Sequence, residues 1–177
     1  MPDRPVLRTA RLVMDMHRPE DLDDCAVMGA DPSVTRHLGG KPFSRSESWW
    51  RILRTAGTWS LSGFGYWALR EASSGRFVGD VGFGDPRRDI TPSLDGIPEI
   101  GWVLASWAHG RSYATEAAQA AIAWADANLA HPETVCLIDL SNVASLRVAE
   151  KAGYVETGRG QLDETETIIL RRRRPVA

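Results

Sequence analysis

The feature that most constrains the fold is an apolar segment at residues 98–104, followed by a short Gly-containing turn and a run of alanines at helical spacing. One face of that run carries Ala114, Ala117, Ala118, Ala121, Ala125 and Leu129. A helix with small side chains on its buried face can lie close to a sheet, because little separates the two backbones. The pattern therefore predicts a strand and then a helix, from about residue 112 to 129, that packs against a sheet.

The turn before this helix has the chemistry of a phosphate site. The first N–H groups of a helix have no partner within the helix, and they lie at the positive end of its dipole. Such a turn suits a bound phosphate, and Arg111 adds a fixed positive charge. On its own the signal is weak, because Gly-containing turns are common before helices.

A second signature follows about 25 residues later and reads Asn142-Val-Ala-Ser145-Leu-Arg-Val-Ala-Glu-Lys151-Ala-Gly153-Tyr154. Asn142 is a good N-cap for a helix. Ser145 falls in a stripe with Val148, Ala149 and Ala152, so its hydroxyl needs a partner. That partner is either a carbonyl one turn back or a ligand.

The remaining patterns outline the rest of the fold. Ser44 and Glu47 form a capping box that opens a helix to about residue 58, and residues 85–98 read as a polar loop. A further helix is expected at 19–28, and strands are expected at 12–16, 65–71, 76–83, 98–104, 135–140, 155–157 and 165–170. Strands cluster early and alternate with helices late, which predicts an α/β (α+β) fold with a mixed sheet and helices on both faces.

The bulk properties exclude several classes of protein. A chain of 177 residues predicts one domain over 1–177, and the net charge of −2 gives no general attraction to nucleic acid or to a membrane. With no long apolar run and no apolar N-terminal segment, we expect a cytoplasmic protein. Cys25 and Cys136 read as buried thiols, and the four histidines share no metal-binding spacing, so no metal is expected. The arginines at 171–174 read as a solvated tail, with a local polyanion contact as the alternative.

The succession of strand, phosphate turn, helix, strand, Asn, helix and Gly-aromatic pair resembles the C-terminal half of a GNAT-type N-acetyltransferase. The pentapeptide Tyr113-Ala-Thr-Glu-Ala117, with the segments 7–12 and 18–22, resembles the RimJ/RimL-like branch, which acetylates ribosomal-protein N-termini. The family writes its turn as Gln/Arg-x-x-Gly-x-Gly/Ala. Ala114 fits that pattern, whereas His109 and Ser112 depart from it.

The resemblance implies a GNAT fold, with a splayed, mostly antiparallel sheet of about seven strands and a cleft beyond the strand at 98–104. It implies that Gly101 lets this strand bulge. It also implies acetyl-CoA as the donor, an amine as the acceptor and a monomer or homodimer. The backbone of Trp102, Val103 and Leu104 would pair with the pantetheine arm as an extra strand. The remaining coenzyme contacts would come from His109, Gly110, Arg111, Ser112, Tyr113, Ala114, Thr115 and Asn142.

Two catalytic roles follow from the same resemblance. In the RimL-like branch a serine is proposed to protonate the departing thiolate, and its place matches Ser145, whereas many relatives carry a tyrosine at the position of Ala149. Glu99 matches the Glu of the family's Glu-Ile-Gly-Tyr/Trp strand and is the candidate base for the amine. The alternatives are that Asp80 or water takes the proton and that Glu99 is a surface carboxylate.

Other functions remain open at this stage. Ala149, His109 and Ser112 keep a catalytically weak acyl-CoA-binding or sensing module as an alternative. A nucleotide-dependent oxidoreductase is disfavoured, because no Gly-x-Gly-x-x-Gly follows an early strand. The acceptor could be a protein N-terminus, an amino acid, a polyamine or an antibiotic, and the segments 44–58 and 85–98 are expected to select it. Trp49, Trp50 and Trp59, in and just after the first segment, read as core residues, with one or two of them as walls of the acceptor pocket as the alternative.

Overall fold

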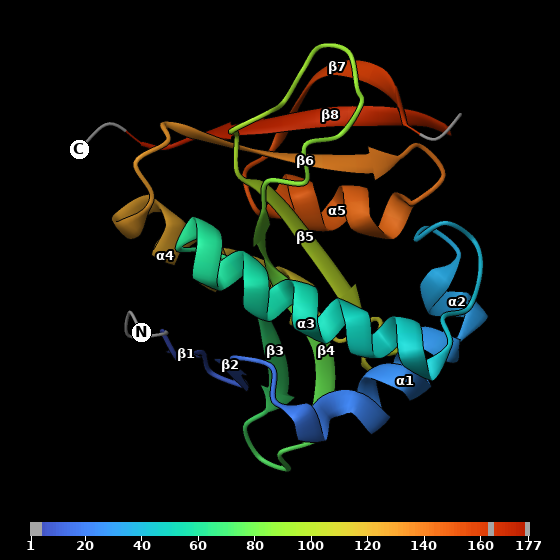
Figure 1. Cartoon of the computed structure of the whole chain (residues 1–177). Coiled ribbons are helices and arrows are strands. Elements are labelled where there is room, and N and C mark those ends of the chain that lie inside the picture. The colour runs from blue at the N-terminus through green and yellow to red at the C-terminus, as the bar shows by residue number, and fades with distance from the viewer. Residues whose placement is uncertain (1–4, 163–164, 176–177) are drawn as a thin grey trace.

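The computed structural model describes residues 5–162 and 165–175, and its centre is one eight-stranded sheet (Figure 1). The order across the sheet is β1-β2-β3-β4-β5-β6-β8-β7, and only β5 and β6 run parallel. The strands are β1 (Leu7–Arg8), β2 (Leu12–Asp15), β3 (Tyr66–Glu71), β4 (Phe77–Gly84), β5 (Glu99–Leu104), β6 (Glu133–Asp139), β7 (Val155–Leu162) and β8 (Thr165–Arg173). The predicted mixed, mostly antiparallel sheet is confirmed. It has one strand more than the seven expected, because the two-residue β1 is too short to show a pattern.

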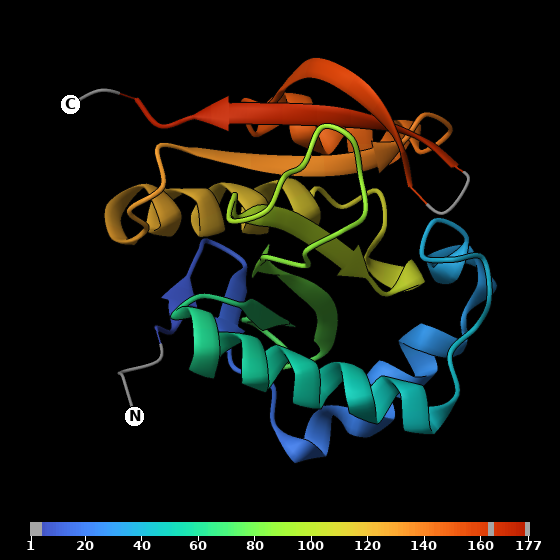
Figure 2. The same ribbon diagram turned by 45° about the horizontal axis from the view of Figure 1, so that its top comes forward.

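Helices cover both faces of the sheet, as predicted. Helices α1 (Leu22–Ala30) and α3 (Arg45–Ser62) lie on one face, and α4 (Tyr113–Asn128) and α5 (Val143–Lys151) lie on the other (Figure 2). Three short segments complete the set, η1 (Pro19–Asp21), α2 (Pro32–Thr35) and η2 (Ser106–Ala108). Helix α3 begins with the expected capping box and ends four residues later than expected, where Gly63 adopts a φ of +73°. Within the described residues, no helix is both long and apolar enough to cross a membrane.

The alanine face of α4 packs against the sheet. Ala117, Ala118 and Ala121 are fully buried and belong to the main core, together with Trp67 of β3 and Val81 of β4. The small side chains let this helix approach the strands closely, which confirms the prediction from the alanine spacing.

The sheet splits between its two parallel strands. β5 and β6 pair at one position only, Glu99 with Val135, and the two strands then diverge. The edge of β5 over Trp102–Leu104 therefore faces a gap in the sheet rather than a partner strand. The expected splay is present, and it lies shortly before the turn that leads into α4.

Gly101 has a different role from the one expected. The β4–β5 register runs without a shift from Gly79–Leu104 to Gly84–Glu99, so the predicted bulge is wrong. A Cβ atom on Gly101 would lie 2.5 Å from the hydroxyl oxygen of Tyr66. This glycine therefore makes room for a tyrosine from β3 rather than bending the strand.

The arginines at 171–174 do not form a solvated tail. They belong to β8 and to its continuation, and β7 and β8 pair along most of their length. Arg172 donates two hydrogen bonds to the Asp126 carboxylate of α4, at 2.8 and 2.7 Å, and Arg171 pairs with Glu133 of β6. Two of these arginines therefore pair closely with carboxylates of other elements, whereas Arg173 is 90% exposed.

The loop at residues 85–98 is partly buried rather than wholly polar. Ile90 and Leu94 pack with Val135 of β6 and Ile169 of β8 in a small separate core. The loop therefore crosses the second half of the sheet, as Figure 2 shows, and it brings Arg88 against the start of β5.

Candidate active site

The turn that leads into α4 leaves the start of this helix uncapped. Gly110 and Ser112 have φ angles of +73° and +63°, in the left-handed region, so the chain turns sharply into the helix. Ser112 occupies the N-cap position, but no side chain caps the helix there. Side chains do cap α3 and α5, through Ser44 and Asn142. The first N–H groups of α4 are thus available to an anion.

Neighbouring elements hold this turn in place. The Tyr113 hydroxyl donates a hydrogen bond of 2.6 Å to Glu71 at the end of β3. Glu116 accepts from the Thr9 hydroxyl at 2.6 Å and from the Arg11 backbone N–H at 2.9 Å, so it has a structural role. Arg11 also donates to the carbonyl oxygen of Arg111 at 3.0 Å.

His109 and Arg111, two of the residues expected to contact the coenzyme, differ in their surroundings. The ring Nε2 of His109 lies 2.9 Å from the carbonyl oxygen of Leu104, so the histidine supports the turn itself. Arg111 is exposed, with its guanidinium 5.4 Å from the ring centroid of Trp107. Arg111 is therefore the more accessible of the two to a bound phosphate.

The structure brings Ser145 and Trp102 together. Asn142 caps α5 by accepting from the Ser145 backbone N–H at 3.2 Å, which confirms its predicted capping role. The Ser145 hydroxyl oxygen accepts a hydrogen bond from the Trp102 indole at 3.2 Å, instead of bonding to a carbonyl one turn back. This contact links α5 to β5 and uses only a lone pair of the serine. The hydroxyl proton remains available as a donor.

Glu99 is buried at the start of β5, with 9% of its surface exposed. Both of its carboxylate oxygens accept hydrogen bonds from the Arg88 guanidinium, at 3.0 and 2.9 Å. The surface-carboxylate alternative is therefore wrong. The role of Glu99 as a base stays a prediction, and this ion pair does not favour it, because an amine would have to displace Arg88 to reach the carboxylate.

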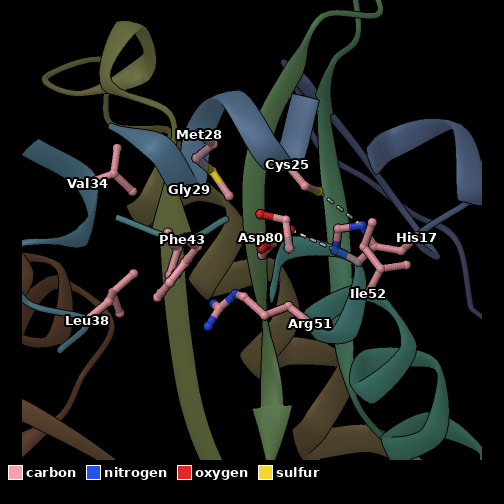
Figure 3. Close-up of a pocket in the computed structure, with 12 residues that line it drawn as sticks. His17, Cys25, Met28, Gly29, Val34, Leu38, Phe43, Arg51, Ile52 and Asp80 are labelled. Carbon is pink, nitrogen blue, oxygen red and sulfur yellow. Dashed lines mark hydrogen bonds and ion pairs between the residues drawn. The ribbon is translucent and has the colours of Figure 1, made fainter. Parts of the chain in front are cut away.

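A pocket lies between α1, α3, β4 and β5 (Figure 3). About 360 Å³ of it is free of protein atoms, part of which is open to solvent. Asp80 of β4 stands directly opposite Val103 of β5 in the register, so the two side chains share this face of the sheet. Val103 is one of the residues expected to pair with pantetheine, so the pocket adjoins the strand expected to carry the coenzyme. Its apolar lining includes Met28, Val34, Leu38, Phe43 and Ile52.

A buried histidine holds the charged end of this pocket. His17 Nε2 lies 2.7 Å from Asp80 Oδ1, and His17 Nδ1 lies 3.6 Å from Asp21. Burial alone would lower the pKa of His17, but the charge of Asp80 and the contact with Asp21 raise it to about 12. The ring is thus an imidazolium at neutral pH. The imidazolium and the Asp80 carboxylate form an ion pair, drawn as a dashed line in Figure 3.

Asp21 completes this network behind the histidine. Its carboxylate pairs with Arg70 of β3 and accepts a backbone hydrogen bond from Arg18 at 2.8 Å. Burial opposes ionisation of Asp21, yet His17, Arg18 and Arg70 together hold its pKa at about 2. The Asp21 carboxylate is therefore ionised, and its oxygens are engaged in contacts with these residues.

Both cysteines are buried and free, as predicted. Burial raises the pKa of Cys25 and of Cys136, so both thiols are protonated at neutral pH. Among the residues that the structure describes, no group of three or more His, Cys, Asp or Glu side chains could hold a metal ion.

Three residues of this region were missed in the sequence. His17 directly follows the buried alternation of Leu12, Met14 and Met16, which is the one signal that could have marked it. Arg51 sits in an ordinary amphipathic helix, and Arg88 lies in a loop without any periodic pattern.

The three tryptophans of α3 differ in how deeply they are buried. Trp59 is buried against Trp67 and Trp124, as predicted, and Trp49 packs partly buried near α1. Trp50 is 66% exposed, so the prediction of a core position is wrong for it.

The comparisons with known proteins agree with this geometry. The family model described as an acetyltransferase (GNAT) domain matches residues 11–155. A protein of Bordetella pertussis assigned to the GnaT family of acetyltransferases is 31% identical, with a TM-score of 0.83 over 96% of this chain and 99% of that one. The uncharacterized protein YkkB of Bacillus subtilis (strain 168) is 29% identical over 76% of this chain and 77% of its own length.

A more distant structure has the same fold. It is an acetyltransferase from Salmonella typhimurium that modifies the N-terminal serine of the ribosomal protein L7/L12, 12% identical, with a TM-score of 0.77 over 96% of this chain and 99% of that one. At this level of identity the likeness shows the fold alone.

Proposed function

Because the chain belongs to the GNAT acetyltransferase family, we propose that it transfers the acetyl group of acetyl-CoA to a primary amine. The observation that carries this proposal is the uncapped start of α4, placed shortly after a strand whose edge faces a gap in the sheet. A helix start of this kind suits a pyrophosphate, and an open strand edge suits the amide groups of a pantetheine arm.

The coenzyme contacts follow from this arrangement. The backbone N–H groups from Gly110 to Ala114 would hold the pyrophosphate, with Arg111 beside it. The backbone of Trp102–Leu104 would pair with the pantetheine arm like an extra strand. Supporting contacts are proposed from His109, Tyr113, Thr115 and Asn142, of which His109 would act by holding the turn.

The reaction would proceed by direct attack within a ternary complex. The amine nitrogen forms a bond to the thioester carbonyl carbon, and the C–S bond breaks with its electron pair remaining on sulfur. Ser145 can give its free hydroxyl proton to that sulfur and recover a proton from solvent. Only modest help is needed, because a thiol has a pKa of about 8.5 and its thiolate leaves readily near neutral pH.

The motifs at residues 7–12, 18–22 and 113–117 favour a relationship to the RimJ/RimL-like branch. The acceptor would then be a protein N-terminal α-amine or a small-molecule amine. An α-amine has a pKa of about 8 and a lysine about 10.4, so an α-amine is more easily available in its neutral form. We expect the protein to act in the cytoplasm as a monomer or homodimer.

Calorimetry with acetyl-CoA, together with thiol release in the presence of a panel of amines, tests this function. Arg111→Ala should weaken acetyl-CoA binding several-fold and flatten its salt dependence, because one charge–phosphate contact is lost. Arg173→Ala, which changes a 90% exposed side chain at the far end of β8, is the matched control and should bind normally.

The outcomes separate the candidate functions. Binding accompanied by amine-dependent thiol release supports the transferase. Binding without release for any amine would instead support the acyl-CoA-binding or sensing alternative. Absence of binding by the wild-type protein would overturn both.

A further inference from the structure

The pocket beside β5 has more positive than negative charge. The pair of His17 with Asp80 lines it, the pair of Arg70 with Asp21 contacts His17, and the pair of Arg88 with Glu99 lines a second hollow at the start of β5. Arg51 and Arg54, one turn apart on α3, join this group, and neither forms an ion pair with a carboxylate of the described residues. The balance of these groups is therefore two positive charges.

Several of these charges act on the hydroxyl of Tyr66 in β3. Burial first, and then the charge of Glu99, raises the pKa of the Tyr66 hydroxyl, whereas the charges of Arg88, Arg51 and Arg54 oppose that shift. The pKa of Arg54 is lowered by desolvation and then by the charge of Arg51, although much of its side chain is exposed. Guanidinium groups that repel one another in this way are stabilised when an anion binds between them.

Arg51 is the member of this group that reaches the pocket. Its guanidinium extends from α3 alongside Phe43, 4.8 Å from the ring centroid, and lies across the pocket from His17 in Figure 3. The aromatic face leaves the N–H groups at the guanidinium edge free to donate hydrogen bonds. A carboxylate is the partner that fits this planar edge with two parallel hydrogen bonds.

The other end of the pocket offers the opposite chemistry. The Asp80 carboxylate lines the pocket beside the imidazolium of His17, and the Asp80 side chain is 14% exposed. An amine N–H can donate to this carboxylate. Between Asp80 and Arg51 the walls are apolar, from Met28, Val34 and Ile52 among others.

We propose that the acceptor is a free amino acid with an apolar side chain, whose amine lies at Asp80 and whose carboxylate lies at Arg51. This inference rests on the proposed acetyl transfer and names its substrate class. The carboxylate of an amino acid carries the charge opposite to the excess of positive charge, and an apolar side chain suits the apolar walls. A polyamine would add cations to a region that already repels them, and a peptide N-terminus lacks the carboxylate next to its amine.

In this arrangement the acetyl group passes from the sulfur of the coenzyme to the nitrogen of the amino acid. The neutral amine attacks the thioester carbonyl carbon, the C–N bond forms, and the C–S bond breaks with its electron pair leaving on sulfur. The nitrogen becomes positively charged on attack, and its proton passes to Asp80 and from there to solvent. The thiolate takes a proton from Ser145 or from water. His17 acts as a positioning residue, because it holds the Asp80 carboxylate without touching the substrate.

The test compares amines that differ only in the carboxylate. Thiol release is measured with leucine and phenylalanine, with their decarboxylated analogues 3-methylbutylamine and 2-phenylethylamine, with leucinamide, with spermidine, and with a tripeptide that begins with serine. We expect kcat/KM to be about 10- to 100-fold higher for the amino acids than for their carboxylate-free analogues, the range expected for a hydrogen-bonded charge pair.

Variants of the pocket residues test which side chain recognises the substrate carboxylate. Arg51→Gln should raise KM for leucine about 10- to 100-fold and leave the KM for 3-methylbutylamine nearly unchanged. Arg51→Lys should recover part of the preference. Arg45→Gln, on the exposed part of the same helix, is the matched control and should keep it. Asp80→Asn should lower kcat for every amine, with acetyl-CoA affinity unchanged.

The results distinguish this inference from the function on which it rests. Thiol release with spermidine or the tripeptide but not with the amino acids, or equal rates with and without the carboxylate, would overturn the inference and leave the transferase intact. Absence of release with every amine would overturn the transferase itself, and the inference with it. The wild-type comparison decides the matter even if a variant fails to fold.

Discussion

The buried imidazolium of His17 should make the protein less stable as the pH rises above neutrality. In the unfolded chain the pKa of His17 has its ordinary value of 6.5, whereas in the folded state Asp80 and Asp21 raise it to about 12 against the effect of burial. The stabilisation from this proton is therefore complete below pH 6.5. It is lost progressively as the pH rises toward the folded-state value.

The size of this pH dependence follows from a difference of one bound proton between the folded and the unfolded chain. Between the two pKa values the folded state holds one proton more than the unfolded chain, so the free energy of unfolding should fall by about 1.4 kcal/mol per pH unit. From about pH 7 to about pH 8.5 the expected loss is about 2 kcal/mol. The window stops below 9.0, the ordinary pKa of a cysteine thiol, because burial raises the pKa of Cys25 and its titration would add a second slope of the same sign.

Urea unfolding at several pH values measures this slope. Tryptophan fluorescence is a suitable signal, because Trp59, Trp67 and Trp124 form a contact cluster with ring centroids 4.9 to 5.6 Å apart. His17→Gln should lack the slope, and Asp80→Asn should reduce it, because burial then acts with less opposition. A wild-type stability that is flat over this range, or an unchanged slope in His17→Gln, would refute the reasoning.

Three further predictions concern packing and catalysis. Gly101→Ala should cost about 1–3 kcal/mol in unfolding free energy, because the new Cβ meets the Tyr66 hydroxyl at 2.5 Å, and Tyr66→Phe in the same chain should restore part of it; equal stability of Gly101→Ala and wild type would contradict this contact. Ser145→Ala should lower kcat by up to about 100-fold without changing acetyl-CoA affinity in calorimetry, and an unchanged kcat would mean that water protonates the thiolate. Arg172→Ala should cost about 1–2 kcal/mol by urea unfolding, and Asp126→Ala in that background should add less than it costs alone; fully additive losses would show that the ion pair is not coupled.

The parts of the fold that the sequence predicts are those set by local chemistry. The alanine stripe of α4, the capping box at Ser44 and the N-cap at Asn142 each depend on residues within a few positions of one another. Their structural roles can therefore be read without knowledge of the rest of the chain.

The features that the sequence does not predict depend on partners far along the chain. Arg172 belongs to a strand because Asp126 of α4 faces it, 46 residues earlier, and Gly101 makes room for Tyr66 rather than for a bulge. Neither partner can be identified from spacing. The run of arginines and the single glycine therefore suggested the more common tail and bulge.

The pocket of the candidate site also depends on residues far apart in the sequence, so the sequence did not predict it. Its charged groups come from the segment after β2, from α3 and from β4, as His17, Arg51 and Asp80. Asp80 was recognised as an alternative base because it interrupts an apolar strand. Its relation to His17 appears only when the sheet brings β2, β3 and β4 together.

The single pairing between β5 and β6 has a consequence for how the protein behaves without its coenzyme. A strand edge with free N–H and C=O groups is a template on which another chain can add, which is a common route to aggregation. Here the edge over Trp102–Leu104, where His109 already contacts the Leu104 carbonyl, is the one proposed to pair with pantetheine. Acetyl-CoA would then act as a removable strand that protects this edge. Purified protein depleted of coenzyme should therefore be less soluble on storage than the same protein kept with it.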